Sequence, residues 1–446
     1  MFKKVLIANR GEVALRILRA CRDLNIETVM IHSEADEDSM PVRLADEAVC
    51  IGPARASDSY LNIPNILSAA RITGADAIHP GWGFLSENAQ FADIIRNLGI
   101  AFIGPSPEDI STMGDKIKAK QTAEELGIPV VKGSKGGVVD AGEARKLADE
   151  IGYPVILKAA SGGGGRGMKV VERPEQLEEN LSLCRSEAKA AFGDDAVYME
   201  KYLTLPRHVE IQLLADGKGN CIHLGERDCS IQRRHQKVIE EAGCPVLSND
   251  QRNEIGEITA KAVGNMGYKG VGTVEYLYEN GKFYFIEMNT RLQVEHPVSE
   301  LITGLDIVEQ QIRVASGEEL SLRQQDISFY GHAIECRINA ENPENFTPSP
   351  GTITQYHPPG GLGVRIDSHI FSDYRIPPYY DSLISKLIVH GPTREKAIER
   401  LERALKEYVI GGVQTNLPLH QKIIQTDAFL SGDYNIHWLE NWMQKS

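Results

Sequence analysis

The sequence predicts a mixed α/β protein of two or three domains, and three observations support this prediction. The chain has 446 residues, 42% of them hydrophobic and 25% charged, which is typical of a globular protein of this size. Over residues 1–105, short apolar runs alternate with helical patterns, as in a mostly parallel sheet covered by helices. From residue 204 to about residue 300, apolar runs separated by turn residues favour antiparallel hairpins.

Composition and charge argue against several classes of protein. The net charge of −14 at pH 7 disfavours a nucleic acid partner, because such binding requires a basic surface. We expect no membrane span and no signal peptide, because no run of about 20 apolar residues occurs and the N-terminal apolar run is too short. Seven scattered cysteines without a C-x-x-C pair indicate the reduced thiols of a cytoplasmic protein.

Residues 1–115 predict a Rossmann-like domain. Apolar runs expected to form strands lie at residues 5–8, 28–31, 48–51, 75–78 and 101–103. Helical patterns lie between several of them, at residues 12–24, 62–72 and 87–98. The first turn, Asn9-Arg10-Gly11-Glu12, lacks the G-x-G-x-x-G fingerprint, so a dinucleotide site has little support.

The first helix carries two pairs of opposite charges spaced four residues apart. These pairs are Glu12 with Arg16 and Arg19 with Asp23. Such spacing places both partners on one side of a helix, so we expect a solvated face with ion pairs.

A linker helix is expected at residues 116–130, and a small lid at residues 131–203. In the lid, a strand ending at Lys158 leads into a run of glycines interrupted by Arg166, and a second strand follows at 168–171. This run is not a P-loop, because no G-K-[ST] closes it. Its bare N–H groups can approach phosphate oxygens closely, so we expect a flap over a nucleotide, with a flexible hairpin tip as the alternative.

Residues 204–446 are expected to form the rest of the protein, including an amphipathic helix at 393–409. Within it, Glu275 and Glu287 flank the turn Glu279-Asn280-Gly281. A regular two-residue turn would put the two carboxylates on opposite faces of the hairpin. If both bind one metal ion, we therefore predict a three-residue loop or another bulge nearby.

The segment from residue 287 to residue 295 is the most informative stretch of the chain. Every second position carries a polar side chain: Glu287, Asn289, Arg291, Gln293 and Glu295. In an extended backbone, alternate side chains share a face. Oxygen ligands suit Mg²⁺ and arginine suits an anion, so the row predicts chemistry on a metal-bound phosphate. A half-buried strand with a charged outer face is the alternative.

Two further patterns carry charge. The block 231–237 is basic and suggests an anionic substrate, although a solvated basic stretch is the alternative. In residues 332–339, apolar side chains alternate with Glu335, Arg337 and Asn339. Taken alone, such a carboxylate and guanidinium pair is more often structural than catalytic.

Together these motifs resemble those of the ATP-grasp ligases, and closely those of the biotin carboxylase family. The matching stretches include IANRGE (7–12), HPGWGFLSEN (79–88), MGDK (113–116), LKAASGGGGRGM (157–168), MEKYL (199–203), RHVEIQ (207–212), GERDCSIQRRHQK (225–237), EMNTRLQVEHPV (287–298), HAIECRINAE (332–341) and PPYYDS (377–382). The resemblance spans nearly the whole chain. It implies an ATP-grasp fold with an N-terminal Rossmann-like domain, a glycine-flap lid and a C-terminal mixed domain that completes the biotin site.

The resemblance also implies roles for individual residues. Those expected to bind ATP are Lys116, Lys158, Gly164, Gly165, Glu200, Lys201, Tyr202, Leu203, His208, Gln232, His235, Glu275 and Glu287. Those expected to hold two Mg²⁺ or Mn²⁺ ions are Glu275, Glu287 and Asn289. Bicarbonate would contact Lys237, Arg291 and the Val294 backbone, and Glu295 would deprotonate it. Arg337 would stabilise the biotin enolate near Trp82, and Asp381 could orient Arg337.

Two departures and several partners follow from the same resemblance. The family often has tyrosine where this chain has Trp82, and some relatives have five consecutive glycines where this chain has four. No Ala-Met-Lys-Met site is present, so biotin is expected on a separate carrier protein, with carboxyltransferase subunits completing the complex. Homodimers are common in the family, and Arg19 and Arg365 resemble its interface positions.

The leading interpretation is the biotin carboxylase subunit of acetyl-CoA carboxylase in fatty acid synthesis. The same chemistry in a pyruvate or propionyl-CoA carboxylase is the second. A different ATP-grasp ligase is disfavoured by the contexts of Glu295 and Arg337, and a nucleotide-binding protein without turnover is disfavoured by the intact row from Glu287 to Glu295. The missing glycine fingerprint disfavours an NAD oxidoreductase.

Overall fold

The fold is given by a computed structural model that describes residues 1–134, 136–138, 140–159 and 167–445. Its N-terminal part is a five-stranded parallel sheet of order β3-β2-β1-β4-β5. The strands are β1 (Lys4–Ile7), β2 (Glu27–His32), β3 (Glu47–Cys50), β4 (Ala77–His79) and β5 (Ala101–Phe102). The helices around it are α1 (Gly11–Asp23), α2 (Met40–Leu44), α3 (Ile63–Thr73), α4 (Ala89–Asn97) and α5 (Pro107–Gly114). All five predicted strands and all three predicted helices are confirmed, with ends shifted by one or two residues.

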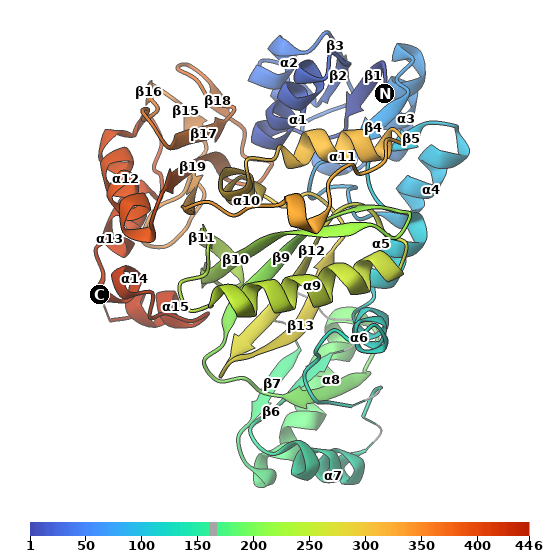
Figure 1. The fold of residues 1–446 in the computed structure, drawn as a ribbon, viewed down its shortest axis with the longest axis vertical. Helices are drawn as coiled ribbons and strands as arrows, with labels where there is room; N and C mark the ends of the chain where they lie inside the picture. The colour runs from blue at the N-terminus through green and yellow to red at the C-terminus, as the bar shows by residue number, and fades with distance from the viewer. Residues whose placement is uncertain (135, 139, 160–166, 446) are drawn as a thin grey trace.

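An eight-stranded antiparallel sheet forms the centre of the molecule (Figure 1). Its order is β13-β12-β9-β10-β11-β14-β19-β17. The strands are β9 (Arg207–Asp216), β10 (Cys221–Arg233), β11 (Gln236–Ala242), β12 (Lys269–Glu279), β13 (Lys282–Asn289), β14 (His332–Asn339), β17 (Val364–Ser368) and β19 (Leu383–Gly391). Helices α9 (Asn249–Asn265), α10 (His296–Thr303) and α11 (Ile307–Ala315) accompany it. Figure 1 shows α9 lying across one face of this sheet.

A small three-stranded sheet lies at one end of the molecule, at the bottom of Figure 1. It contains β6 (Val155–Ala159), β7 (Met168–Val171) and β8 (Val197–Lys201), packed against α7 (Ala141–Ile151) and α8 (Leu177–Phe192). The preceding helix α6 (Lys116–Glu125) is shorter than the predicted 116–130. It ends early because Gly127 has φ +82° and Pro129 cannot continue a helix.

The C-terminal elements build the remaining core around β14 and β19. They are the short strands β15 (Gly351–Thr352), β16 (Gln355–His357), β18 (Arg375–Ile376) and β20 (Val409–Gly411), and the helices α12 (Arg394–Glu407), α13 (Leu417–Ile423), α14 (Asp427–Ser431) and α15 (Trp438–Met443). The predicted helix at 393–409 is α12, whose buried side chains include Ile398, Leu401 and Leu405. Nowhere in the described parts of the chain does a helix combine the length and apolar character needed to cross a membrane.

The hairpin of β12 and β13 solves the predicted parity problem with a bulge. Glu279 pairs with Lys282, so the loop holds two residues and the prediction of a three-residue loop is wrong. The register then shifts by one residue between the Tyr276–Phe285 pair and the Glu275–Glu287 pair. The alternative prediction of a bulge nearby is confirmed, and it puts Glu275 directly opposite Glu287 on one face.

Two other expectations about local structure are wrong. Strand β13 ends at Asn289, so the row from 287 to 295 is not one strand, and residues 290–295 form a loop before α10. Glu12 and Arg16 are not solvated: 4% and 6% of their surfaces are exposed. Arg16 bonds instead to Glu300 at 2.8 Å, because α10 from the far end of the chain packs over this helix face. Arg19 and Asp23 are exposed, as predicted.

Candidate functional site

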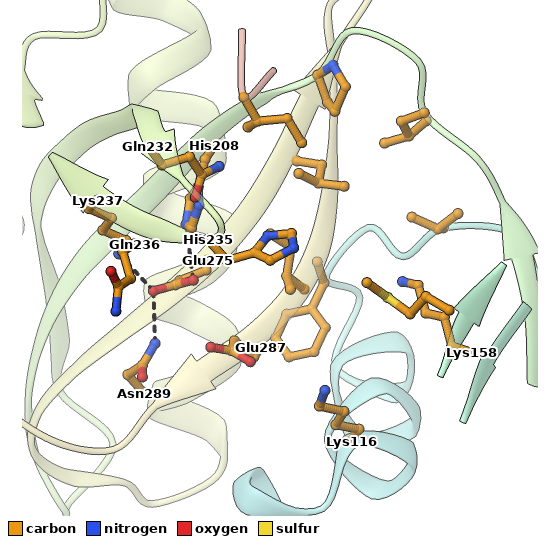
Figure 2. A pocket seen from close by; sticks show the side chains of 18 of the residues that line it. Lys116, Lys158, His208, Gln232, His235, Gln236, Lys237, Glu275, Glu287 and Asn289 are labelled. Atoms are coloured by element: carbon orange, nitrogen blue, oxygen red, sulfur yellow. Dashed lines mark hydrogen bonds and ion pairs between the residues drawn. The ribbon is translucent and has the colours of Figure 1, made fainter. Parts of the chain in front are cut away.

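A cavity of about 1850 Å³ opens between the eight-stranded sheet, helix α6 and the three-stranded sheet. Figure 2 shows Glu275, Glu287 and Asn289 on the sheet side, with Lys116 and Lys158 across the open space. The five side chains of the row from Glu287 to Glu295 all line this cavity, although only two of them lie on a strand. The loop after β13 therefore turns back along the sheet and keeps the row together.

Glu275 and Glu287 form a pair of like charges that fits a divalent cation. Glu275 accepts hydrogen bonds from Lys237, Asn289 and Gln293 at 2.9–3.0 Å. Burial and the neighbouring Glu275 charge raise the pKa of Glu287. Within the described residues, no hydrogen bond ends on the Glu287 carboxylate. A partly desolvated carboxylate with surplus negative charge beside an amide oxygen is a suitable donor set for Mg²⁺.

Lys237 is the central cation of the site. Its Nζ lies 2.6 Å from Glu210, 2.9 Å from Glu275 and 2.6 Å from Glu295. Burial opposes its charge, but these carboxylates outweigh burial and raise the pKa of Lys237 well above its ordinary value. A lysine surrounded in this way stays protonated at neutral pH and holds three carboxylates around one point.

Glu295 bridges the two ends of the site. Its carboxylate accepts from Lys237 at 2.6 Å and from Arg337 at 2.9 Å. Burial alone would raise its pKa, but the charges of Lys237, Arg337 and Arg227 hold the pKa of Glu295 well below its ordinary value. As placed, Glu295 is an ionised carboxylate. It gains basicity only when an incoming anion draws these cations away.

Arg337 is oriented by Glu240, a residue that sequence reasoning missed. Arg337 Nε donates to Glu240 at 2.5 Å, and burial raises the pKa of Glu240 to about 7. Asp381, expected in this place, lines the cavity, but its carboxylate accepts from the Leu383 N–H. Glu240 was missed because it stands on β11, opposite Glu335 of β14, and only the sheet register brings it beside Arg337.

Arg291 reaches into the cavity from the loop after β13. It donates to Glu87 and to Asn289, each at 2.8 Å. Gln293 bonds to Glu275, and its own carbonyl oxygen accepts from the buried Arg227 at 3.2 Å. Arg227 also holds Glu210 at 2.5 Å, so one buried guanidinium fixes two parts of the site.

Glu210 and Arg227 could have been found from the sequence. RHVEIQ places Glu210 two residues after His208, on the same side of a strand. The same alternation in GERDCSIQ separates Arg227 from the residues facing away. The partners of both residues, however, come from other strands and were not predictable.

At the nucleotide end, Glu200 holds two lysines. Lys120 and Lys158 lie 2.5 and 2.7 Å from its carboxylate. Lys201 donates to the backbone oxygens of Gly152 and Tyr153, at the base of β6. The other expected residues that line this part of the cavity are Lys116, Tyr202, Leu203, His208, Gln232 and His235. Gly164 and Gly165 lie outside the described residues.

His208 and Trp82 occupy opposite sides of the cavity. Burial opposes charge on His208, but Glu275, at 2.9 Å, outweighs it and raises the pKa of the imidazole. Trp82 is half-buried, and its Nε1 donates to Glu12 at 3.4 Å. The structure thus brings the expected nucleotide, metal, bicarbonate and biotin residues to one cavity, the two glycines excepted.

Comparisons with known families agree with this arrangement. The family model "Biotin carboxylase, N-terminal domain" matches residues 1–110, "Carbamoyl-phosphate synthase L chain, ATP binding domain" matches residues 115–323, and "Biotin carboxylase C-terminal domain" matches residues 335–441. Together they cover nearly the whole chain.

Full-length relatives and solved structures are similar throughout. A biotin carboxylase of Allochromatium vinosum is 59% identical over 99% of each chain. The structure of a biotin carboxylase–β-γ-ATP complex from Campylobacter jejuni is 51% identical, covers 99% of each chain and has a TM-score of 0.94. A biotin carboxylase domain dimer of Hydrogenobacter thermophilus 2-oxoglutarate carboxylase, with MgADP, ADP and bicarbonate, is 49% identical, covers 99% of this chain and 98% of its own, and has a TM-score of 0.92.

Proposed function

Because the chain belongs to the biotin carboxylase family, whose ATP-grasp ligases carboxylate biotin at the expense of ATP, we propose a division of this reaction among its residues. The observation that carries the proposal is Glu295, held between Lys237 and Arg337 in the same cavity as Glu275 and Glu287. This places a base, two cations and a metal-binding pair around one space.

The first half-reaction begins with bicarbonate beside Glu295. Lys237, Arg291 and the Val294 N–H bind the anion, and Glu295 takes its proton. A carboxylate is a weak base for bicarbonate in water, with a reference pKa of about 4.3. As the bound anion draws Lys237 toward itself, Glu295 loses a charge partner and the carbonate dianion gains one, so the proton transfer becomes less unfavourable.

The nucleotide end delivers the γ-phosphoryl group to that carbonate. Lys116 and Lys158 hold the phosphates, while Glu275, Glu287 and Asn289 hold the divalent cations. When bound, those ions neutralise phosphate charge and stabilise the transferring group. The carbonate oxygen attacks phosphorus and ADP leaves, which gives carboxyphosphate. Water must be excluded from this product, and the glycine segment of the lid is proposed to close over it.

The second half-reaction takes place beside Arg337. Carboxyphosphate breaks its C–O bond to give CO2 and trianionic phosphate, and the phosphate takes the ureido N–H proton of biotin. Arg337, fixed by Glu240, stabilises the negative charge that develops on the ureido oxygen. The ureido nitrogen then attacks CO2 to form carboxybiotin.

The acyl acceptor and the assembly are part of the proposal. We favour the acetyl-CoA carboxylase complex, with biotin on a carrier protein and transfer by carboxyltransferase subunits. The 2-oxoglutarate carboxylase relative supports a different acceptor as the second candidate. The exposed Arg19 and the open sheet edge at β17, which carries Arg365, support a homodimer, as does the dimer in that relative. Seven free cysteines support a reducing location such as the cytoplasm.

The deciding experiment is phosphate release from MgATP with bicarbonate, measured with and without free biotin. Slow release that requires bicarbonate and rises with biotin is the expected result. Release that ignores both compounds, or no release at all, would leave only a nucleotide-binding protein. Capture of a biotinylated acetyl-CoA carboxylase carrier, compared with a pyruvate carboxylase carrier, then separates the two candidate complexes.

A further inference from the structure

Lys386 is a fully buried lysine of β19 that the proposed reaction does not use. Its Nζ donates to the backbone oxygen of Val294 at 2.8 Å. The same nitrogen lies 3.1 Å from the Glu12 carboxylate and 3.8 Å from that of Asp367. A buried charge is expensive unless several acceptors surround it, and a carboxylate alone would satisfy a simple structural pair. The bond to a loop carbonyl requires a separate explanation.

The Val294 carbonyl belongs to the peptide that joins Val294 to Glu295. On one side of this peptide is the Val294 N–H, which makes no hydrogen bond to any residue in the described parts of the chain. On the other side is the Glu295 side chain, which meets Lys237 and Arg337. Both residues line the cavity. The orientation of this one peptide therefore decides whether the N–H and the carboxylate face the same small anion.

Nothing else that the structure describes ties this carbonyl down. Residues 290–295 lie outside β13, so no strand ladder fixes them, and Glu295 is the residue before helix α10. Lys386 stands on β19, next to Arg337 of β14 and Asp367 of β17 in the sheet register. Asp367 is itself bonded to Arg365 at 2.8 Å. The lysine is thus mounted on a rigid sheet and supports a loop that has none.

We propose that Lys386 is a positioning residue for bicarbonate. By holding the Val294–Glu295 peptide, it aims the Val294 N–H and the Glu295 carboxylate at one bound anion. This inference rests on the proposed function, because it assigns a support to the bicarbonate site of that reaction. Lys386 does not touch bicarbonate, so its removal acts through the loop.

The test compares two variants that avoid leaving an unpaired buried charge. Glu12→Gln removes the carboxylate and leaves the lysine bonded to Val294. The double variant Glu12→Gln/Lys386→Met removes both charges together with the bond to the loop. Bicarbonate-dependent ATP cleavage is measured without biotin. We expect the double variant to raise the KM for bicarbonate at least about tenfold above Glu12→Gln, with the KM for ATP within about twofold.

Each outcome is decisive. Equal bicarbonate KM values in the single and double variants overturn the inference. An equal rise in both KM values overturns it too, because a general loss of structure has that effect. Arg394→Met, which breaks a buried pair with Glu241 far from the cavity, serves as the control for destabilisation alone. If the double variant does not fold, Glu12→Gln/Lys386→Gln is judged by the same criterion. Absence of bicarbonate-dependent cleavage in the unaltered protein would instead reject the proposed function.

Discussion

At the scale of single residues, the site separates two half-reactions through the partners of one arginine. Arg337 contacts Glu240 and Glu295, and neither lies among the residues around the ATP phosphates. We expect Arg337→Ala to keep bicarbonate-dependent ATP cleavage within about threefold and to reduce biotin carboxylation by about 10²- to 10⁴-fold. Glu295→Gln should reduce both activities, because it removes the base. Equal loss of both activities in Arg337→Ala would refute this division.

Glu240 gives a second residue-scale prediction. Since it accepts from Arg337 Nε while Asp381 bonds to its own loop, Glu240→Gln should disturb Arg337 more than Asp381→Asn does. We expect biotin carboxylation to fall about tenfold in Glu240→Gln, with bicarbonate-dependent ATP cleavage within about twofold. Both rates are measured for both variants. A larger loss in Asp381→Asn would return the orienting role to Asp381.

At the scale of elements, the bulge in β13 places a metal ligand. Residue Ile286 is the extra residue between the two pairing registers, and 37% of its surface is exposed. Deleting it should continue the regular pairing and turn Glu287 to the opposite face of the hairpin. We expect the KM for MgATP to rise at least about tenfold. Ile286→Ala keeps the bulge and should stay close to the unaltered protein; a deletion variant with unchanged MgATP affinity would contradict this role.

The same scale shows how far sequence reasoning reaches. The strands and helices of residues 1–105 were predicted correctly, because apolar periodicity is a local property. The fate of Glu12 and Arg16 was not, because their partners Lys386 and Glu300 lie hundreds of residues away. The row after Glu287 was assigned to the right cavity on the wrong backbone. Alternation fits an extended loop as well as a strand, and only hydrogen bonding distinguishes the two.

At the scale of the whole molecule, buried histidines predict loss of stability in acid. Burial lowers the pKa of His420 to about 4, and its Nε2 bonds to the Arg337 carbonyl at 2.8 Å. His223 is similarly shifted to about 4, and His79 and His369 to about 3. The unfolded chain takes up these protons near pH 6.5 and the folded protein does not. Stability is therefore fully present above that pH and is lost as the pH falls toward 4.

The expected size of this effect for His420 alone is about 3 kcal/mol between pH 7 and pH 4, from a shift of about 2.5 pKa units. Urea unfolding at a series of pH values measures it. His420→Gln should flatten the curve by that amount, since glutamine cannot take up the proton. A variant that follows the pH dependence of the unaltered protein would exclude His420 as a source.

One feature of the cavity restricts the form in which nucleotide can enter. Lys237, Arg291, Lys158 and Arg337 are each already neutralised by carboxylates of the protein itself. The chamber therefore has no surplus of positive charge to offer to a tetra-anion, and bare ATP would meet repulsion from Glu275 and Glu287. Nucleotide must arrive as its magnesium salt and supply its own counter-charge, so ATP in excess chelator should compete poorly with it.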